Sequence, residues 1–265
     1  MYRQRYRGFE SLLLRIGKGR SARAGRPFVV GRGATYDEAH LRRVPALRFE
    51  RFAPEVRAVV WAARESTDEL AAALPEHWRR GLPRHPSRAR ETLSARRALL
   101  ALLPEAAPAT LTRDRYGRPR LPDLPGVFFS LSHSHGHAAA LVARSPCGVD
   151  LQRRVAKITR LRSKFERPDE RASVARAADE AGALHVLWGA KESLFKLWSR
   201  REVDWHEHLV VREFDYVPGG GSFLAEVRKT DPPIPARAWW RWLDEFCLVG
   251  AVDVGGSALA LPDWP

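Results

Sequence analysis

Cysteines and long apolar runs are scarce in this chain of 265 residues. Its two cysteines, Cys147 and Cys247, are too few for a disulfide framework, and no Cys/His spacing typical of a zinc site occurs. We therefore expect a reducing compartment, the cytoplasm. The longest apolar runs, such as AAALVA, are far shorter than the ~18 residues that a membrane-spanning helix needs. We accordingly expect no membrane-spanning segment and no membrane partner.

Several short motifs of known chemistry are absent as well. The sequence has no Gly-x-x-x-x-Gly-Lys-Ser/Thr phosphate loop and no dinucleotide-binding fingerprint. It also lacks a nucleophile-elbow serine and the histidine spacing of zinc proteases. Nothing in the sequence therefore favours these classes of nucleotide-binding proteins and hydrolases.

Lysine is rare too, because six of the 45 basic residues are lysines and the others are arginines. The net charge is +14, and 45% of the chain is hydrophobic. This composition is typical of a folded protein with one large domain or two lobes, and not of a disordered chain. The charge predicts an anionic partner: nucleic acid, a membrane surface, an acidic protein or a phosphorylated ligand.

The basic residues are dense in the first 30 residues, which include one acidic residue and many arginines. We expect residues 1–30 to be a poorly ordered extension or the product of a misplaced start. A targeting peptide or an anion-binding segment is the alternative.

The remainder of the chain has helix-like and strand-like segments in two similar series, which predicts an α+β fold with antiparallel sheets. We place an N-terminal lobe at 45–145 and a C-terminal lobe at 146–260. Predicted helices cover 66–80 (with Thr67 or Asp68 as N-cap), 87–103, 155–165, 168–183 and 184–200. Predicted strands cover 44–52, 55–66, 127–133, 137–145, 147–152, 208–217, 221–229, 236–244 and 246–254, and 112–126 is a predicted loop.

The pentapeptide GVDLQ has an acid and an amide at alternate positions of a predicted strand. Because residues i and i+2 of a strand face the same way, Asp150 and Gln152 project together while Val149 and Leu151 point to the core. The oxygens of Asp150 and Gln152 can coordinate a hard cation. A surface strand with its polar residues outward is the alternative.

The stretch FFSLSHSHGH places hydroxyls and imidazoles around a predicted turn. Ser130 and Ser132 share one face of the strand, and His133 lies where the strand ends. A hydroxyl, an imidazole and turn amides together can bind a phosphate. Two alternatives remain open: His133, His135 and His137 bind a transition metal, or the stretch is simply a polar hairpin tip.

In WGAKESLFK, Lys191 falls inside the apolar arc of the predicted helix, and Glu192 borders that arc. Glu192 and Lys196 have the i,i+4 spacing that stabilises a solvated helix by ~0.2–0.5 kcal/mol. This spacing does not explain Lys191. Either the Lys191 stem snorkels to water, or the arc borders a cleft in which an anion binds.

In their order and spacing, YGRP, FSLSHS, GVDLQ and WGAKESLFK resemble the motifs of the 4′-phosphopantetheinyl transferases, in particular those of the larger, two-lobed kind. The family pattern Trp-x-x-Lys-Glu-Ser/Ala-x-x-Lys is matched at Trp188, Lys191, Glu192, Ser193 and Lys196.

This resemblance covers roughly residues 45–255. It implies two similar lobes related by a pseudo-twofold axis, with coenzyme A bound in the cleft between them. The implied reaction is Mg²⁺-dependent. It transfers the 4′-phosphopantetheine arm of coenzyme A to a serine hydroxyl of an apo carrier protein and releases adenosine 3′,5′-bisphosphate.

The resemblance also implies roles for single residues. Asp150 and Glu192 hold the metal ion, Glu192 takes the serine proton, and Lys196 contacts the diphosphate. Gln152 stands where many relatives have a second acid, so we expect it to bind Mg²⁺ weakly, through water or not at all. The expected coenzyme A contacts are Arg80, Arg113, Arg118, Ser132, His133, Lys191 and Lys196.

The expected partners are coenzyme A and an acidic carrier protein, both of which suit a basic protein. We expect a monomer and no specific nucleic-acid partner. Two other functions stay open: an inactive or divergent relative that binds coenzyme A, and an Arg-rich nucleic-acid-binding protein. The second of these leaves the ordered motifs unexplained.

Overall fold

The computed structural model describes residues 47–53, 55–200 and 202–255. Within this part of the chain the α+β class is confirmed, because antiparallel sheets pack against helices. In the same part, every helix is too short or too polar to span a bilayer. The predictions for residues 1–30 and 256–260 lie outside the described residues.

The first half of the chain forms a four-stranded antiparallel sheet with the strand order β1-β2-β6-β5. Strand β2 faces two cores, because Val59 and Trp61 point to one side and Ala58 and Val60 to the other. In chain order the elements are β1 (Leu47–Ala53), β2 (Val56–Ala62), α3 (Thr67–Ala72), η1 (Glu76–Arg79), α4 (Pro86–Leu102), η2 (Pro104–Ala106), β3 (Thr112–Arg113), β4 (Pro119–Arg120), β5 (Phe128–Ser134) and β6 (His137–Ala143).

The second half forms a five-stranded antiparallel sheet with the strand order β7-β11-β10-β9-β8. Its elements are β7 (Cys147–Arg153), α5 (Ile158–Leu161), η3 (Arg162–Lys164), α6 (Arg171–Arg176), α7 (Glu180–Trp198), β8 (Leu209–Val211), β9 (Gly220–Val227), β10 (Ile234–Leu243) and β11 (Phe246–Asp253).

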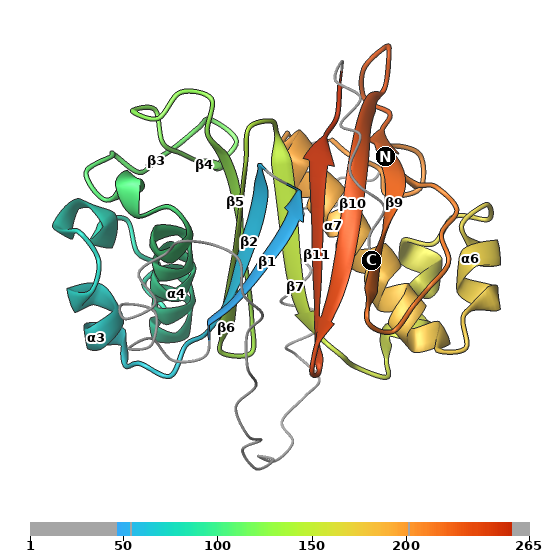
Figure 1. The fold of residues 1–265 in the computed structure, drawn as a ribbon, viewed down its shortest axis with the longest axis horizontal. Coiled ribbons are helices and arrows are strands. Elements are labelled where there is room, and N and C mark those ends of the chain that lie inside the picture. Colours follow the sequence, from blue (N-terminus) through green and yellow to red (C-terminus); the bar gives the residue numbers. More distant parts are fainter. Residues whose placement is uncertain (1–46, 54, 201, 256–265) are drawn as a thin grey trace. The chain divides into compact units, whose positions relative to one another are not determined.

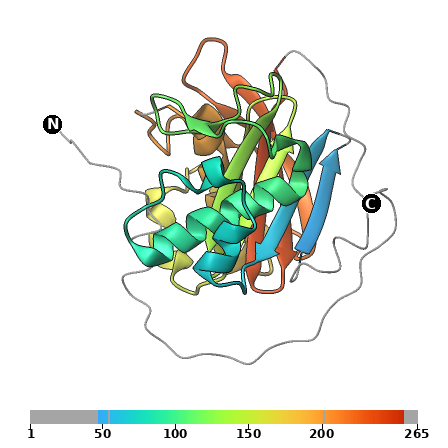
Figure 2. The ribbon, with the colours of Figure 1, turned by 90° about the vertical axis from the view of Figure 1, so that its left-hand side faces the viewer.

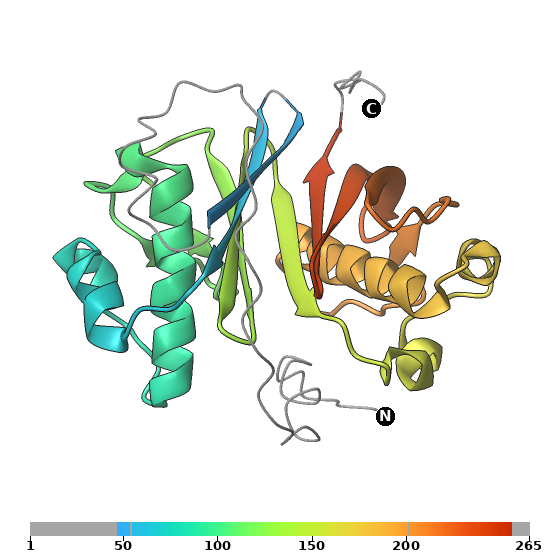
Figure 3. The same cartoon turned by 60° about the horizontal axis from the view of Figure 1, so that its bottom comes forward.

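Figures 1 and 3 show these two sheets side by side, with α4 outside the first sheet and α7 outside the second. Figure 2 shows α4 lying across the strands of the first sheet. The inner faces of the sheets share one hydrophobic core, which includes Phe52, Leu141, Leu151, Trp239 and Leu248. A second core lies between the first sheet and the helices α3 and α4.

Strands β5 and β7 meet where the two sheets adjoin, and serine hydroxyls connect them. Ser130 Oγ accepts a hydrogen bond of 3.0 Å from Val149 N, and Ser132 Oγ accepts one of 3.1 Å from Leu151 N. These buried N–H groups are therefore satisfied by side chains and not by a strand ladder. The connection fixes β7, and with it Asp150, beside β5.

Helix α7 lies directly against β7. A Cβ atom added at Gly148 would lie 1.8 Å from the backbone oxygen of Ser193, so only glycine fits at this position. At Gly189, on the helix side, a Cβ would lie 2.5 Å from a methyl group of Val249. The two glycines bring the second half of α7 close to the strand that carries Asp150.

Several predicted boundaries are wrong. The predicted helix over 66–80 is two short elements, because Pro75 separates α3 from η1, and its N-cap is Ser66 in a capping box with Glu69. Helix α7 begins at Glu180 and not at 184, because Asp179 caps it through a hydrogen bond from Gly182 N.

Other differences concern length. Helix α6 has six residues and not sixteen, and the predicted strand over 208–217 shortens to β8. The predicted loop over 112–126 contains the short antiparallel ribbon β3–β4. The predicted lobe boundary near residue 145 stays a prediction, although the chain leaves the first sheet after β6 and enters the second at β7.

Candidate active site

A pocket of about 540 Å³ lies between η1, α4, the β3–β4 ribbon, β5 and the C-terminal turn of α7. Among the described residues that line it, none is acidic. Its basic side chains are Arg80, Arg96, Arg113, Arg118, Lys196 and Arg200. Six cations around one cavity create a strongly positive potential, so the pocket suits a ligand with several negative charges.

The β3–β4 ribbon presents two of these cations. Asp114 Oδ1 accepts hydrogen bonds from Tyr116 N at 2.9 Å and Arg118 N at 3.0 Å, which closes the turn. Gly117 has a φ angle of +89°, a conformation that favours glycine. This tight turn directs Arg113 and Arg118 into the pocket. Burial lowers the pKa of Arg118, although its guanidinium stays charged.

Lys196 connects the pocket to the buried acid on β7. Its Nζ lies 3.0 Å from Asp150 Oδ1 and 3.2 Å from Ser132 Oγ, and it donates to Val149 O at 2.8 Å. Ser132 Oγ also lies 3.2 Å from Asp150 Oδ1. Asp150 is only 6% exposed, so its charge needs this compensation. The cluster therefore holds one buried acid beside one cation, and Lys196 is the member that lines the pocket.

Glu192 lies one helical turn before Lys196 on α7 and is partly exposed. The i,i+4 spacing puts both side chains on the same face of the helix. The side-chain hydrogen bonds that Asp150 makes within the described residues all use Oδ1, which leaves Oδ2 for another contact.

The two predicted phosphate contacts of β5, Ser132 and His133, have different surroundings. Ser132 is 3% exposed, and its hydroxyl belongs to the cluster of Asp150 and Lys196. His133, the next residue along the strand, lines the pocket, with Nδ1 3.6 Å from Glu91 Oε2. The alternation of strand side chains explains this separation.

The transition-metal alternative for the three histidines has no support. Among the described residues, no group of three or more His, Cys, Asp or Glu side chains is placed to hold a metal ion. His137 packs on Phe246, with ring centroids 4.1 Å apart. The hairpin tip is closed by His135, whose φ angle is +46°, and by Gly136.

Gln152 makes two hydrogen bonds with one residue of α7. Its Nε2 donates to His185 O at 2.8 Å, and its Oε1 lies 2.8 Å from His185 Nδ1. Because Val155 N donates to His185 Nε2 at 3.0 Å, the ring proton is on Nδ1 and Oε1 accepts it. Burial lowers the pKa of His185 to about 4, so this ring is neutral. One lone pair of the Gln152 oxygen is thus already used.

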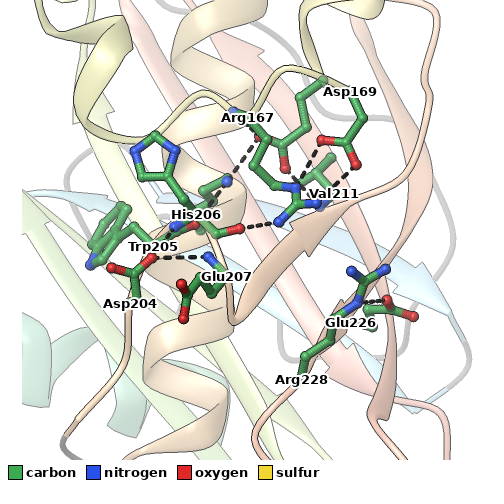
Figure 4. A network of polar contacts seen from close by, with 11 residues as sticks. Arg167, Asp169, Asp204, Trp205, His206, Glu207, Val211, Glu226 and Arg228 are labelled. Atoms are coloured by element: carbon green, nitrogen blue, oxygen red, sulfur yellow. Dashed lines mark hydrogen bonds and ion pairs between the residues drawn. The ribbon is translucent and has the colours of Figure 1, made fainter.

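The structure does not bring Lys191 to the pocket. Its side chain is fully buried, with Nζ 2.9 Å from Glu170 Oε2 and 3.0 Å from Trp205 O. Figure 4 shows the polar network around this site, in which Arg167 also reaches Asp169 and the backbone of His206. Lys191 therefore neither snorkels to water nor faces an anion in the cleft. It forms an ion pair inside the protein.

Sequence reasoning missed two cations of the pocket, Arg96 and Arg200. It also missed Glu170, the buried carboxylate that pairs with Lys191. For Arg96 a signal existed. It lies three residues after Leu93 and three before Leu99, inside the apolar stripe of α4, as Lys191 does on α7. Glu170 gave no comparable signal, because it lies in a charged stretch far from Lys191 in the sequence.

A family model supplies independent information on the second half of the chain. Residues 146–240 match the model ACPS, which describes the 4′-phosphopantetheinyl transferase superfamily. A comparison with curated proteins gives no match. The matched range includes Asp150, Glu192 and Lys196. Residues 146–240, from β7 into β10, therefore match a domain of the 4′-phosphopantetheinyl transferase superfamily.

Proposed function

We propose that this protein transfers the 4′-phosphopantetheine arm of coenzyme A to a serine of an apo carrier protein, as holo-carrier synthases do. One observation carries the proposal. Arg80, Arg113, Arg118, His133 and Lys196 come from four separate segments of the chain and line one pocket, and none of the described residues around it is acidic. Three of these segments lie before the part that the family model matches.

The pocket residues supply what coenzyme A requires. Its diphosphate and its 3′-phosphate carry several negative charges, and the arginines neutralise them by charge-assisted hydrogen bonds. Lys196 contacts the diphosphate and stabilises the charge that develops on the leaving phosphate. The Lys196–Asp150 contact of 3.0 Å holds the ammonium in place for this role.

The donor set fits Mg²⁺, which commonly takes one or two carboxylates together with phosphate oxygens and water. Asp150 Oδ2 and the Glu192 carboxylate would hold the ion, and the ion would neutralise the diphosphate and orient it. Gln152 contributes through water or not at all, since its amide is bonded to His185. Glu192 accepts the proton of the attacking serine hydroxyl.

An acidic carrier protein approaches a chain whose net charge is +14. The two sheets act as two similar lobes related by a pseudo-twofold axis, and one chain supplies both sides of the pocket, so a monomer suffices. Both cysteines are free and buried, in agreement with a reducing cytoplasm.

The experiment is to incubate the protein with coenzyme A, Mg²⁺ and each of several apo carrier proteins, and to measure the carrier mass. A gain equal to one phosphopantetheine group is expected for at least one carrier. We expect Glu192→Gln and Asp150→Asn to lower the rate by about 100-fold or more, because each removes a metal ligand and Glu192 is also the base. Removing Mg²⁺ with a chelator should have a similar effect.

The matched control is Glu180→Gln on the same helix. Glu180 is exposed and pairs with Arg162 at 2.5 Å, outside the pocket, so its variant should keep the wild-type rate. No mass gain with any carrier would contradict the transfer reaction. A wild-type rate in Glu192→Gln would contradict the metal and base roles even if transfer occurs.

A further inference from the structure

Arg96 is a buried cation in the wall of the pocket. It belongs to α4, in the stripe that also contains Leu93 and Leu99, and it is 6% exposed. Its Nη1 donates to Arg80 O at 3.0 Å and also to Trp78 O. One nitrogen of the guanidinium thus holds the backbone of the segment that carries Arg80.

No carboxylate pairs with Arg96 anywhere in the described part of the chain. Burial lowers the pKa of Arg96, and the positive charge of Arg113 lowers it further. A buried charge without a counter-ion is costly, and it usually finds one. Lys191, the other cation inside an apolar helix stripe, has Glu170 as its partner. Arg96 has no such partner among the described residues, so the pocket that it lines is where a negative charge can reach it.

The geometry leaves room for that partner. Nε and Nη2 of Arg96 make no hydrogen bond within the described residues, and neither nitrogen is sealed off from solvent. The side chain lines the pocket together with Arg80, Arg113 and His77. Two adjacent N–H groups of a guanidinium match two oxygens of a phosphate.

We propose that Arg96 binds a terminal phosphate monoester of the pocket ligand, with Nε and Nη2 as donors, while Nη1 keeps the Arg80 segment in place. This inference rests on the proposed function, in which that group is the 3′-phosphate of coenzyme A. The Lys196 end of the pocket then binds the diphosphate, and the Arg96 end binds the 3′-phosphate. Because dephospho-coenzyme A lacks this phosphate, the protein prefers coenzyme A.

The test is calorimetric titration with adenosine 3′,5′-bisphosphate and with 5′-AMP, which lacks the 3′-phosphate. Arg96→Gln should weaken binding of the bisphosphate by about 10- to 100-fold, the usual range for a lost charge-assisted hydrogen bond. Binding of 5′-AMP should change less than threefold. In transfer assays, the same variant should lose the preference for coenzyme A over dephospho-coenzyme A through KM.

The control is Arg97→Gln, the next residue on α4. Arg97 donates to Ala73 O at 2.8 Å and lies over the Trp61 ring, outside the pocket, so its variant should bind both nucleotides as the wild type does. Thermal unfolding without ligand checks the fold of each variant. If Arg96→Gln does not fold, Arg96→Lys decides, because it keeps the charge and loses the fork. We expect it to weaken bisphosphate binding selectively.

A second comparison separates direct contact from an effect through Arg80. In an Arg80→Gln background, Arg96→Gln should still weaken bisphosphate binding, since the two residues make separate contacts. Equal weakening for both nucleotides, no weakening, or no effect in that background would each overturn the proposal. If the wild type binds the bisphosphate selectively but modifies no carrier, the proposed function fails while the role of Arg96 stands.

Discussion

Lys191 and Glu170 form an ion pair that water does not reach, with side-chain exposures of 0% and 1%. Such a pair is kept by its further hydrogen bonds, because desolvation of both charges offsets much of their attraction. Glu170 accepts from Arg167 N at 2.9 Å and from Val211 N at 3.0 Å, and Lys191 donates to Trp205 O. Burial raises the pKa of Glu170, an effect that the Lys191 ammonium opposes. The pair thus links α7 to the segments before α6 and β8.

We expect Lys191→Met to lower the free energy of unfolding by about 3–5 kcal/mol, because it leaves the Glu170 carboxylate buried without its cation. Urea denaturation measures this change. KM for coenzyme A should stay at the wild-type value at temperatures where the variant is folded. The double variant Lys191→Met with Glu170→Met should recover most of the lost stability.

Lys196→Met is the matched comparison on the same helix. Lys196 is 26% exposed and lines the pocket, so its loss should abolish transfer. Because the loss also leaves the buried Asp150 carboxylate without its cation, we expect stability to fall by about 1–3 kcal/mol. A raised KM in Lys191→Met, with little loss of stability, would show that Lys191 contacts coenzyme A after all.

The Gln152 amide has a structural role that its position in GVDLQ does not reveal. Gln152→Glu removes the donor to His185 O and places a carboxylate beside a buried carbonyl group. We expect stability to fall by about 1–3 kcal/mol, as is usual for a buried polar group that loses its partner. The Mg²⁺ concentration needed for half-maximal transfer should not change. Gln152→Met tests the same bonds without a new charge, and a lower Mg²⁺ requirement in Gln152→Glu would place residue 152 at the metal.

At the scale of elements, the strands were predicted well where the residue pattern follows the alternation that a pleated sheet requires. The hairpin of β5 and β6 and the strand β7 appear within two residues of their predicted bounds, because apolar residues mark them and turn residues end them. Helix starts were predicted less well. Ser66 caps α3 in a capping box and Asp179 caps α7 through one side-chain hydrogen bond, whereas Thr67 and Asp68, next to Ser66, are equally good caps by residue type.

The candidate site shows the same limit. The i,i+2 spacing correctly places Ser132 and Asp150 on particular faces of β5 and β7, but it does not tell that these faces meet. The third member of this cluster, Lys196, reaches Asp150 because Gly148 lets α7 approach β7 closely. Likewise, helical periodicity puts both Lys191 and Arg96 in apolar stripes. Only the fold shows that one faces Glu170 and the other the pocket.

At the scale of the whole molecule, charge and architecture act together. Two antiparallel sheets share a core, and the segments around β5 and the end of α7 enclose a pocket with six cations. The chain as a whole carries a net charge of +14. The overall charge steers anions towards the protein, whereas the pocket cations hold them, and these two contributions respond differently to single substitutions.

We therefore expect KM for coenzyme A to rise on the order of tenfold between low salt and 0.5 M salt, with little change in kcat, because screening weakens attraction between separated charges. Arg113→Gln, in the pocket, should flatten this salt dependence. Arg228→Gln removes the same charge from an exposed side chain that pairs with Glu226. This variant should keep the wild-type dependence of KM on salt concentration. Steady-state kinetics over a salt series measures both. Equal slopes for the two variants would mean that the net charge of the chain, and not the pocket, governs how this protein attracts its anionic substrate.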